Sequence, residues 1–420
     1  MFDIQMSKKS FFGASLGTMV EYYDYALFII FLPMLSSLFF PGNTAYQSLV
    51  KGYIVLSIAM IARPLGGIFF GYIGDMFSRR KALLASMYGI AFATIIIGIT
   101  PSTFSLGIWA TIIITLAKSI QLFCFGGEYS GAGIYVVEHA QNKREAFAGS
   151  MLSAMTLFGS LVASVIGVLL TLPGMPDWSW RIAFMIGGVM GFLGIFYRKN
   201  MIDLPNFKPA NTKEHSFLNL IKKFPKEILV GIFIGGSASA PITTVLTFID
   251  PVLMTKGYFS SHYLMLLQTV LITFGIATLF VVGSCADKLT PNKVMKFGCW
   301  LVMMTAYPIL LAIDYGNLFL IIPALISLVI LNEIFLSPSN AYFKNLFPMQ
   351  YRYRGSSLGF CLGVSLFAGL TPLVESYLYH LTGHFSSIAL WLISISFGTY
   401  LSLHLVEKKQ ASFSLATASA

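Results

Sequence analysis

Glu21 and Asp24 are two acidic residues in the otherwise apolar stretch SLGTMVEYYDYALF. A separation of three residues places both carboxylates on roughly one face of a helix. Ionisable groups are costly to bury in apolar surroundings, so their presence there indicates a function. A carboxyl group in an apolar cavity favours its protonated form, and it can take up and release a proton. Proton binding is therefore the chemistry that this pair predicts.

Glu128 is a third acid in an apolar stretch, and the two glycines before it allow another helix to approach closely. Two bases lie in similar surroundings. Lys118 precedes Glu128 by about 15 Å along a helix, and Arg63 lies in the second apolar stretch. We predict that Glu21, Asp24 or Glu128 binds the proton. The alternative is structural, because Glu21 or Asp24 can form a permanent ion pair with Arg63 or Lys118.

Other polar residues in the apolar stretches are candidates to contact a bound ligand. Tyr22 and Tyr23 can present hydroxyl groups to a cavity or pack as core residues. Glu333 has two alternative roles, as a ligand contact or as the packing partner of Lys344. The residues that we predict to bind the ligand are Tyr22, Tyr23, Arg63, Lys118, Gln121, Asn332, Glu333 and Glu375.

The composition indicates a membrane protein. The 420 residues are 56% hydrophobic and only 10% charged, whereas a soluble domain carries roughly 25% charged residues. The net charge of +10 could suggest a nucleic-acid partner. However, the bases cluster in short loops between apolar stretches, which is typical of membrane topology. We therefore expect the lipid bilayer as a partner, and no nucleic acid.

Twelve apolar stretches are long enough to cross a bilayer as helices, which takes about 20 residues each. The composition and these stretches predict an all-α membrane protein with twelve transmembrane helices. The predicted spans are approximately 12–39, 52–73, 82–100, 105–137, 147–171, 181–198, 227–255, 262–285, 294–313, 317–343, 356–381 and 385–405.

The distribution of lysine and arginine predicts the topology. With both termini in the cytoplasm, most of the 27 bases fall on the inner side, as the positive-inside rule requires. The exceptions are Lys51, Arg63, Lys118, Arg181 and Lys256. The chain then divides into a six-helix bundle (1–198), a cytoplasmic linker (199–226), a second six-helix bundle (227–405) and a disordered cytoplasmic tail (406–420).

The two halves contain weak repeats of each other. Gly71 and Asp75 follow the second span, and Gly283 and Asp287 follow the eighth with the same spacing. Gly-Ser pairs also open the fifth and eleventh spans, at nearly the same distance along the chain. Six spans per half give both halves the same orientation. We therefore predict parallel repeats about an axis along the membrane normal, with the ligand between them near the midplane.

Enzyme chemistry is not predicted. The four cysteines fall in apolar segments without metal or disulfide spacing, and the six histidines form no ligand pair on one helix face. No nucleophile and base occur together. We expect no cofactor, and the energy source that the buried acids suggest is a proton gradient.

The loop GYIGDMFSRRKAL (71–83) has the pattern Gly–x3–Asp–x3–Arg. It resembles the signature loop of the major facilitator superfamily. The departures are Met76, where the family usually has a base, and Ser78, where it usually has glycine. The resemblance implies the major facilitator fold and a loop that gates one end of the bundle.

A closer resemblance covers about residues 12–400. The stretches VEYYDYALF, ARPLGGIFFGYIGD, GGEYSGAGIYVVEH and DWSWRIAF stand in the order and spacing of the metabolite:proton symporter family, and FPMQYRYRGSSLGF and AGLTP also fit it. That family includes proline/betaine, α-ketoglutarate, citrate and shikimate importers. The sequence is most similar to the proline/betaine branch. Its seventh span, SASAPITTVLTFIDP, lacks the tyrosine pair of that branch, which argues against a quaternary ammonium ligand.

The resemblance implies a proton-coupled importer that works by alternating access, as a monomer, in a bacterial inner membrane. A cavity with more acids than bases favours a zwitterion, such as an amino acid or osmolyte. The family's charge relay implies gating roles for a set of residues at the inner side: Gly71, Asp75, Arg79, Arg80, Glu138, Arg144 and Asp287.

Three alternatives remain open. Arg63 and Lys118 could converge on a di- or tricarboxylate, which would give an organic-acid:proton symporter. The same fold also serves proton-driven exporters of drugs or siderophores, because a fold does not determine the direction of transport. A non-transporting membrane sensor is a further alternative, but it would need a long soluble signalling domain.

Overall fold

The computed structural model describes residues 8–140, 144–172, 174–199 and 217–418, and every regular element in these residues is helical. Eleven helices are long and apolar enough to cross a membrane, and α1 with α2 would make a twelfth as one bent span. This agrees with the predicted fold of about twelve spans.

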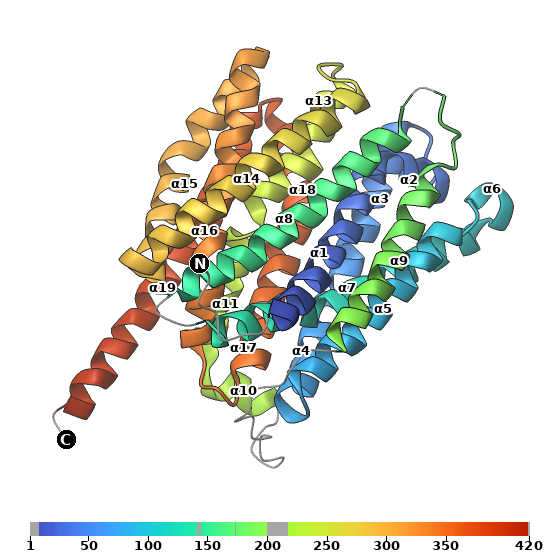
Figure 1. The fold of residues 1–420 in the computed structure, drawn as a ribbon. Helices are drawn as coiled ribbons and strands as arrows, with labels where there is room; N and C mark the ends of the chain where they lie inside the picture. Colours follow the sequence, from blue (N-terminus) through green and yellow to red (C-terminus); the bar gives the residue numbers. More distant parts are fainter. Residues whose placement is uncertain (1–7, 141–143, 173, 200–216, 419–420) are drawn as a thin grey trace.

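The helices of the first half form one group in Figure 1, coloured blue to green. The spans come from α1 with α2, α3 with α4, and then α5, α7, α8 and α9. The bounds are α1 Lys8–Ile30, α2 Leu32–Phe39, α3 Ala45–Met60, α4 Ala62–Met76, α5 Arg79–Ile99, α6 Thr103–Leu106, α7 Ile108–Glu138, α8 Glu145–Leu170 and α9 Trp180–Arg198.

The helices of the second half are coloured yellow-green to red in Figure 1. Two of its spans are interrupted by short π-helical segments, labelled η1 and η2. The bounds are α10 Phe217–Lys223, α11 Pro225–Ser237, α12 Ala240–Thr243, η1 Thr244–Ile249, α13 Asp250–Thr255, α14 Ser261–Leu289, α15 Pro291–Asp314, α16 Leu318–Leu346, α17 Arg352–Gly363, η2 Val364–Ala368, α18 Gly369–Thr382, the 3-10 helix η3 Phe385–Ile388 and α19 Ala389–Ala418.

Proline and glycine account for the interrupted spans. The first span bends by 65° between α1 and α2, because Pro33 has no N–H to donate to the carbonyl four residues earlier. In the seventh span, Gly235 and Gly236 precede the end of α11, and Pro241 stands in the first turn of α12. These residues weaken the regular α-helix, so the break falls in the middle of the span.

Two predicted segments lie outside the spans, namely the linker and the tail. The predicted linker contains α10, and its residues 200–216 lie outside the described residues. The structure continues α19 to Ala418, whereas we expected the last span to end at 405 and a disordered tail to follow. The sequence VEKKQASFSLATA has no glycine or proline, so nothing in it stops the helix.

The two halves meet along two equivalent pairs of helices. α8 of the first half packs along α14 of the second, and α4 packs against α17. These pairs join spans five and eight, and spans two and eleven, as expected for two repeats related by an axis between them. We call the end of the bundle where α5, α8 and α17 begin the basic end.

Glycines allow the closest helix contacts within the first half. A Cβ at Gly126 of α7 would overlap the backbone oxygen of Arg63 in α4, and a Cβ at Gly66 would overlap the backbone oxygen of Phe123. These contacts hold the second span against the fourth. Small residues are the usual means of such close approach in membranes.

The variant Gly126→Val should lose most of its folded protein, because backbone atoms cannot move away as a flexible side chain can. Overpacking typically lowers the free energy of unfolding by about 1–3 kcal/mol. Because the overlap here is with backbone atoms, we expect a loss at the upper end of this range. Size-exclusion chromatography and thermal unfolding in detergent measure the effect. Gly369→Ala is the matched control, because its Cβ would meet Met60 at an ordinary 3.4 Å. Normal yield and stability of Gly126→Val would contradict the packing.

Candidate functional site

A cavity of about 110 Å³ lies between the two halves. Its walls come from α1, α4 and α8 of the first half and from α12, η1, α14, α16, α17 and η2 of the second. The cavity is therefore incomplete in either half alone. Its volume is smaller than the roughly 300–1,000 Å³ of pockets for drug-sized ligands, so it suits a small metabolite.

Two opposite charges from different halves line this cavity. Arg63 comes from α4 and Glu333 from α16, and both side chains are buried. One oxygen of Glu333 accepts a hydrogen bond from Asn332 Nδ2 at 3.0 Å, whereas its Oε2 has no hydrogen-bond partner in the structure. The cavity thus offers a cation on one wall and a carboxylate with a free oxygen on another.

Glu21 lies behind this cation. Its Oε1 is 4.0 Å from Arg63 Nη2, and neither carboxylate oxygen has a hydrogen-bond partner in the structure. The side chain is buried. The predicted ion pair with Arg63 is therefore present, but it is long and has no supporting hydrogen bonds, so Glu21 is weakly compensated.

Asp24 belongs to a chain of hydrogen bonds within the first half. Thr94 Oγ1 donates to Asp24 Oδ2 at 2.6 Å, and Gln121 Nε2 donates to Thr94 Oγ1 at 2.9 Å. Lys118 Nζ donates to Gln121 Oε1 at 2.6 Å and lies 4.4 Å from the ring centroid of Phe28. Lys118 and Asp24 are thus linked through two neutral side chains, and neither lines the cavity.

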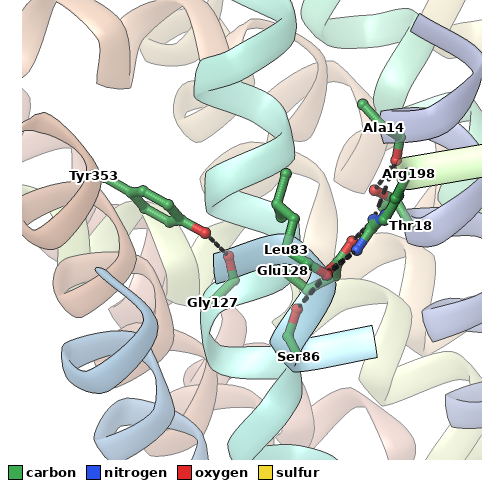
Figure 2. Close-up of polar contacts among 8 residues, drawn as sticks. All are labelled: Ala14, Thr18, Leu83, Ser86, Gly127, Glu128, Arg198 and Tyr353. Carbon is green, nitrogen blue, oxygen red and sulfur yellow. Dashed lines mark hydrogen bonds and ion pairs between the residues drawn. The ribbon is translucent and has the colours of Figure 1, made fainter. Parts of the chain in front are cut away.

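Glu128 is held by a full set of partners inside the first half (Figure 2). Arg198, at the end of α9, contacts both carboxylate oxygens, one of them through Nη1 at 2.7 Å. Ser86 Oγ donates to the same oxygen at 2.9 Å. Arg198 also donates to the backbone oxygen of Leu83 at 2.6 Å. Both charged side chains are completely buried, and this geometry is that of a fixed ion pair.

Several predicted ligand contacts line the cavity and others do not. Tyr22, Arg63, Asn332 and Glu333 line it. Tyr23 instead donates its hydroxyl to the backbone oxygen of Ala183 at 2.9 Å, joining α1 to α9. Glu375 accepts a hydrogen bond from Thr244 Oγ1 at 2.5 Å, where α18 contacts η1. Tyr23, Lys118, Gln121 and Glu375 are absent from the cavity wall.

Two reciprocal contacts join the halves at the basic end. Asp75 Oδ2 accepts hydrogen bonds from the backbone N (3.2 Å) and Nε (3.0 Å) of Arg354, in the first turn of α17. Asp287 accepts from the backbone N of Ala146 (2.8 Å) and of Phe147 (3.1 Å), in the first turn of α8. Each carboxylate therefore meets the positive end of a helix from the other half.

Ion pairs surround these contacts. Glu138 pairs with Arg79 of its own half and, at 2.7 Å, with Arg352 of the other. Lys344 pairs with Glu145 across the halves at 2.6 Å, and not with Glu333 as one prediction had it. Gly71, another predicted gating residue, lies where a Cβ would be 3.0 Å from Arg354 Cα.

The two remaining predicted gating residues lie at the edge of this cluster. Arg80 donates to the backbone oxygen of Lys199, directly after α9, and Arg144 is exposed at the N-cap of α8. The cross-half contacts of Asp75, Asp287, Glu138 and Lys344 hold the two halves together at the basic end.

Sequence reasoning did not identify the partners that decide these arrangements. Arg198 contributes only to the predicted topology, and Arg352 and Arg354 contribute only to the topology and to the family motif FPMQYRYRGSSLGF, because each stands at one end of an apolar stretch. Gln268, which lines the cavity, lies in the eighth span, and nothing in the sequence around it distinguishes it as a ligand contact. An arginine directly at the end of a span is the one feature that could have suggested a partner for a buried acid.

The sequence profile of the Major Facilitator Superfamily matches residues 14–372. The chain belongs to this superfamily, as the loop motif predicted. It is 30% identical to a putative proline/betaine transporter of Staphylococcus aureus (strain COL), over 99% of this chain and 91% of that one. It is 27% identical to the proline/betaine transporter of Escherichia coli (strain K12), over 93% and 81% of the two chains. The protein is therefore a multi-pass membrane transporter similar to proline/betaine transporters, and not an enzyme.

Solved structures show the same fold. The proton:xylose symporter XylE matches with a TM-score of 0.72 and 15% identity, over 95% of both chains. The transporter FucP in the outward conformation matches with a TM-score of 0.69 and 14% identity, over 94% of this chain and 98% of that one. These matches support the major facilitator architecture of two joined six-helix units.

Replacing Glu128 by glutamine should destabilise the protein by about 3–5 kcal/mol, because the buried Arg198 charge loses its counter-ion. The double variant Glu128→Gln/Arg198→Met should recover most of this loss, because it removes both charges. Thermal unfolding of the purified variants in detergent measures both effects. A single variant as stable as the wild type would contradict a structural role for this pair.

Proposed function

We propose that the protein is a proton-coupled importer of a small zwitterion, an amino acid or an osmolyte. One observation carries the proposal: Arg63 and Glu333, a buried cation and a buried carboxylate from different halves, line the same cavity. A zwitterion can place its carboxylate on the guanidinium and its ammonium group on Glu333 Oε2. The named proline/betaine transporters among the relatives support this substrate class.

Aromatic side chains in the cavity extend the proposal to betaines. Tyr22, Tyr25 and Phe360 line the cavity, and aromatic faces attract quaternary ammonium groups. The seventh span lacks the tyrosine pair of the proline/betaine branch. Rings from α1 and α17 supply the faces that the seventh span lacks.

Glu21 is our candidate for the proton-binding residue. Arg63 is its nearby cation, at 4.0 Å, and the same guanidinium lines the cavity. When a substrate carboxylate binds Arg63, the guanidinium charge is shared, and Glu21 is left without full compensation in apolar surroundings. A proton on Glu21 then restores the charge balance. Substrate and proton are coupled through one shared arginine.

Glu128 and Asp24 are less suited to this role. Arg198 and Ser86 hold the carboxylate of Glu128 from several directions, so its charge is already balanced. Asp24 lies in a closed chain that ends at Lys118 and does not reach the cavity wall. Neither acid shares a cation with the proposed substrate site.

Transport by alternating access requires the closed basic end to open. The contacts of Asp75, Asp287 and Glu138 with the opposite half would then break together. We further propose that the basic end faces the cytoplasm of a bacterial cell, with both termini on that side of the inner membrane. The lysine and arginine distribution supports this orientation. We expect a monomer, because the cavity needs only the two halves of one chain.

The organic-acid alternative has less support. A dicarboxylate site needs two converging cations, and Lys118 is turned to Gln121 and Phe28 instead of the cavity. The small cavity volume also disfavours large drugs or siderophores.

Purified protein in proteoliposomes with a pH-sensitive dye inside tests the proposed function. L-proline or glycine betaine should acidify the lumen, because each substrate molecule enters with a proton. Succinate, a dicarboxylate, is the matched comparison and should give little response. Acidification by succinate alone would favour the organic-acid symporter. No response to any of the three compounds, from folded protein, would contradict the importer.

The variant Glu21→Gln should abolish proton-driven accumulation of L-proline and leave exchange of L-proline across the membrane within about threefold of wild type. Glutamine keeps the shape of the side chain but cannot bind the coupling proton. Radiolabelled uptake and counterflow in proteoliposomes separate the two activities. Glu407→Gln, at a half-exposed acid paired with Lys296, is the control. Wild-type accumulation by Glu21→Gln would exclude Glu21 as the coupling residue.

A further inference from the structure

A second hollow adjoins the central cavity on the side away from the basic end. It has a volume of about 280 Å³. Ile29, Ile30, Leu246 and Gln268 line both spaces, so the two are direct neighbours that share a wall. Most of the wall of the hollow is apolar. The hollow therefore lies next to the space that Arg63 and Glu333 line, on its side away from the basic end.

Asp250 is the only charged residue among the described residues that line this hollow. It stands at the junction of η1 and α13, and it is completely buried. Gln268 Nε2 donates to its Oδ2 at 2.9 Å, whereas Oδ1 has no hydrogen-bond partner in the structure. An acid at this position therefore has half of its hydrogen-bonding capacity unused in a space that can hold a ligand.

The residues that line the hollow favour an organic cation over a metal ion. A bound calcium ion takes six to eight oxygen ligands, and the hollow has one carboxylate among side chains such as Pro33, Met34 and Met265. An alkyl-bearing ammonium group matches both features, because its charge can meet Asp250 Oδ1 while its carbon atoms contact the apolar walls.

We propose that Asp250 and Gln268 form an entry site that holds the ammonium end of the zwitterion before it moves to the central cavity. Gln268 lines both spaces and positions Asp250 from the boundary between them. The ammonium group then passes from Asp250 to Glu333, and the carboxylate goes on to Arg63. This inference rests on the proposed function, because it concerns the same zwitterionic substrate.

Uptake of L-proline into cells, compared with equilibrium binding of L-proline to purified protein, tests the entry site. The variant Asp250→Asn should lower kcat/KM for uptake about tenfold and leave the equilibrium Kd of the central cavity within twofold. Asp250→Glu keeps the carboxylate and should recover part of the rate. Asp177→Asn, at an exposed acid between α8 and α9, controls for surface charge and should transport normally.

An unchanged kcat/KM for uptake in Asp250→Asn would overturn the entry site. A rise in the equilibrium Kd that accounts for the whole loss of kcat/KM would also overturn it, because the substitution would then act on the central cavity. If wild-type protein transports neither L-proline nor glycine betaine, the proposed function fails and the entry site fails with it. If wild type transports them and Asp250→Asn does so equally well, only the entry site fails.

A protection experiment keeps the test decisive if Asp250→Asn does not fold. Met34 lines the hollow, so Met34→Cys introduces a thiol there, and Glu333→Gln in the same protein weakens the central site. Saturating L-proline should slow labelling of this thiol by an impermeant maleimide several-fold. Unprotected labelling in the Asp250-containing protein would overturn the proposal.

Discussion

Two aspartates, each bonded to the start of a helix from the opposite half, determine how the rest of the structure is arranged. Asp75 meets the first turn of α17 and Asp287 meets the first turn of α8. These helices are also the ones that pack across the interface, on α4 and α14. The same four helices therefore form both the packing interface between the halves and the aspartate contacts at the basic end. The cavity lies between the two halves that this contact holds together.

The cost of burying charge distinguishes the acids of the first half. Glu128 has a bidentate arginine and a serine hydroxyl, Asp24 has a threonine hydroxyl, and Glu21 has one arginine at 4.0 Å. The number of hydrogen bonds that each carboxylate accepts falls in that order. An acid with complete compensation has little to gain from a proton, whereas a weakly compensated acid changes state when its one counter-ion is drawn to a substrate. This difference is the reason that we propose Glu21, and not Asp24 or Glu128, as the proton-binding residue.

The sequence predicted the spans, the two parallel repeats and the family, because these depend on local composition and spacing. It also identified Gly71, Asp75, Gly283 and Asp287 as a repeated motif. It did not predict that each copy contacts the other half, since that contact depends on packing between distant segments. The partner of Glu128 was missed for the same reason: Arg198 is 70 residues away. The bend at Pro33 was missed because the apolar pattern continues through it without interruption.

The buried acids have different partners, and this difference favours a zwitterion over a simple cation or anion. In the first half, Glu21 and Glu128 lie beside arginines, whereas Asp24 accepts a hydrogen bond from Thr94. In the second, Asp250, Glu333 and Glu375 each accept a hydrogen bond from a neutral side chain and keep one oxygen without a hydrogen-bond partner in the structure. The second half is thus suited to receive positive charge, while Arg63 of the first can receive negative charge. A substrate that carries both charges satisfies both walls at once, and only when the halves are together.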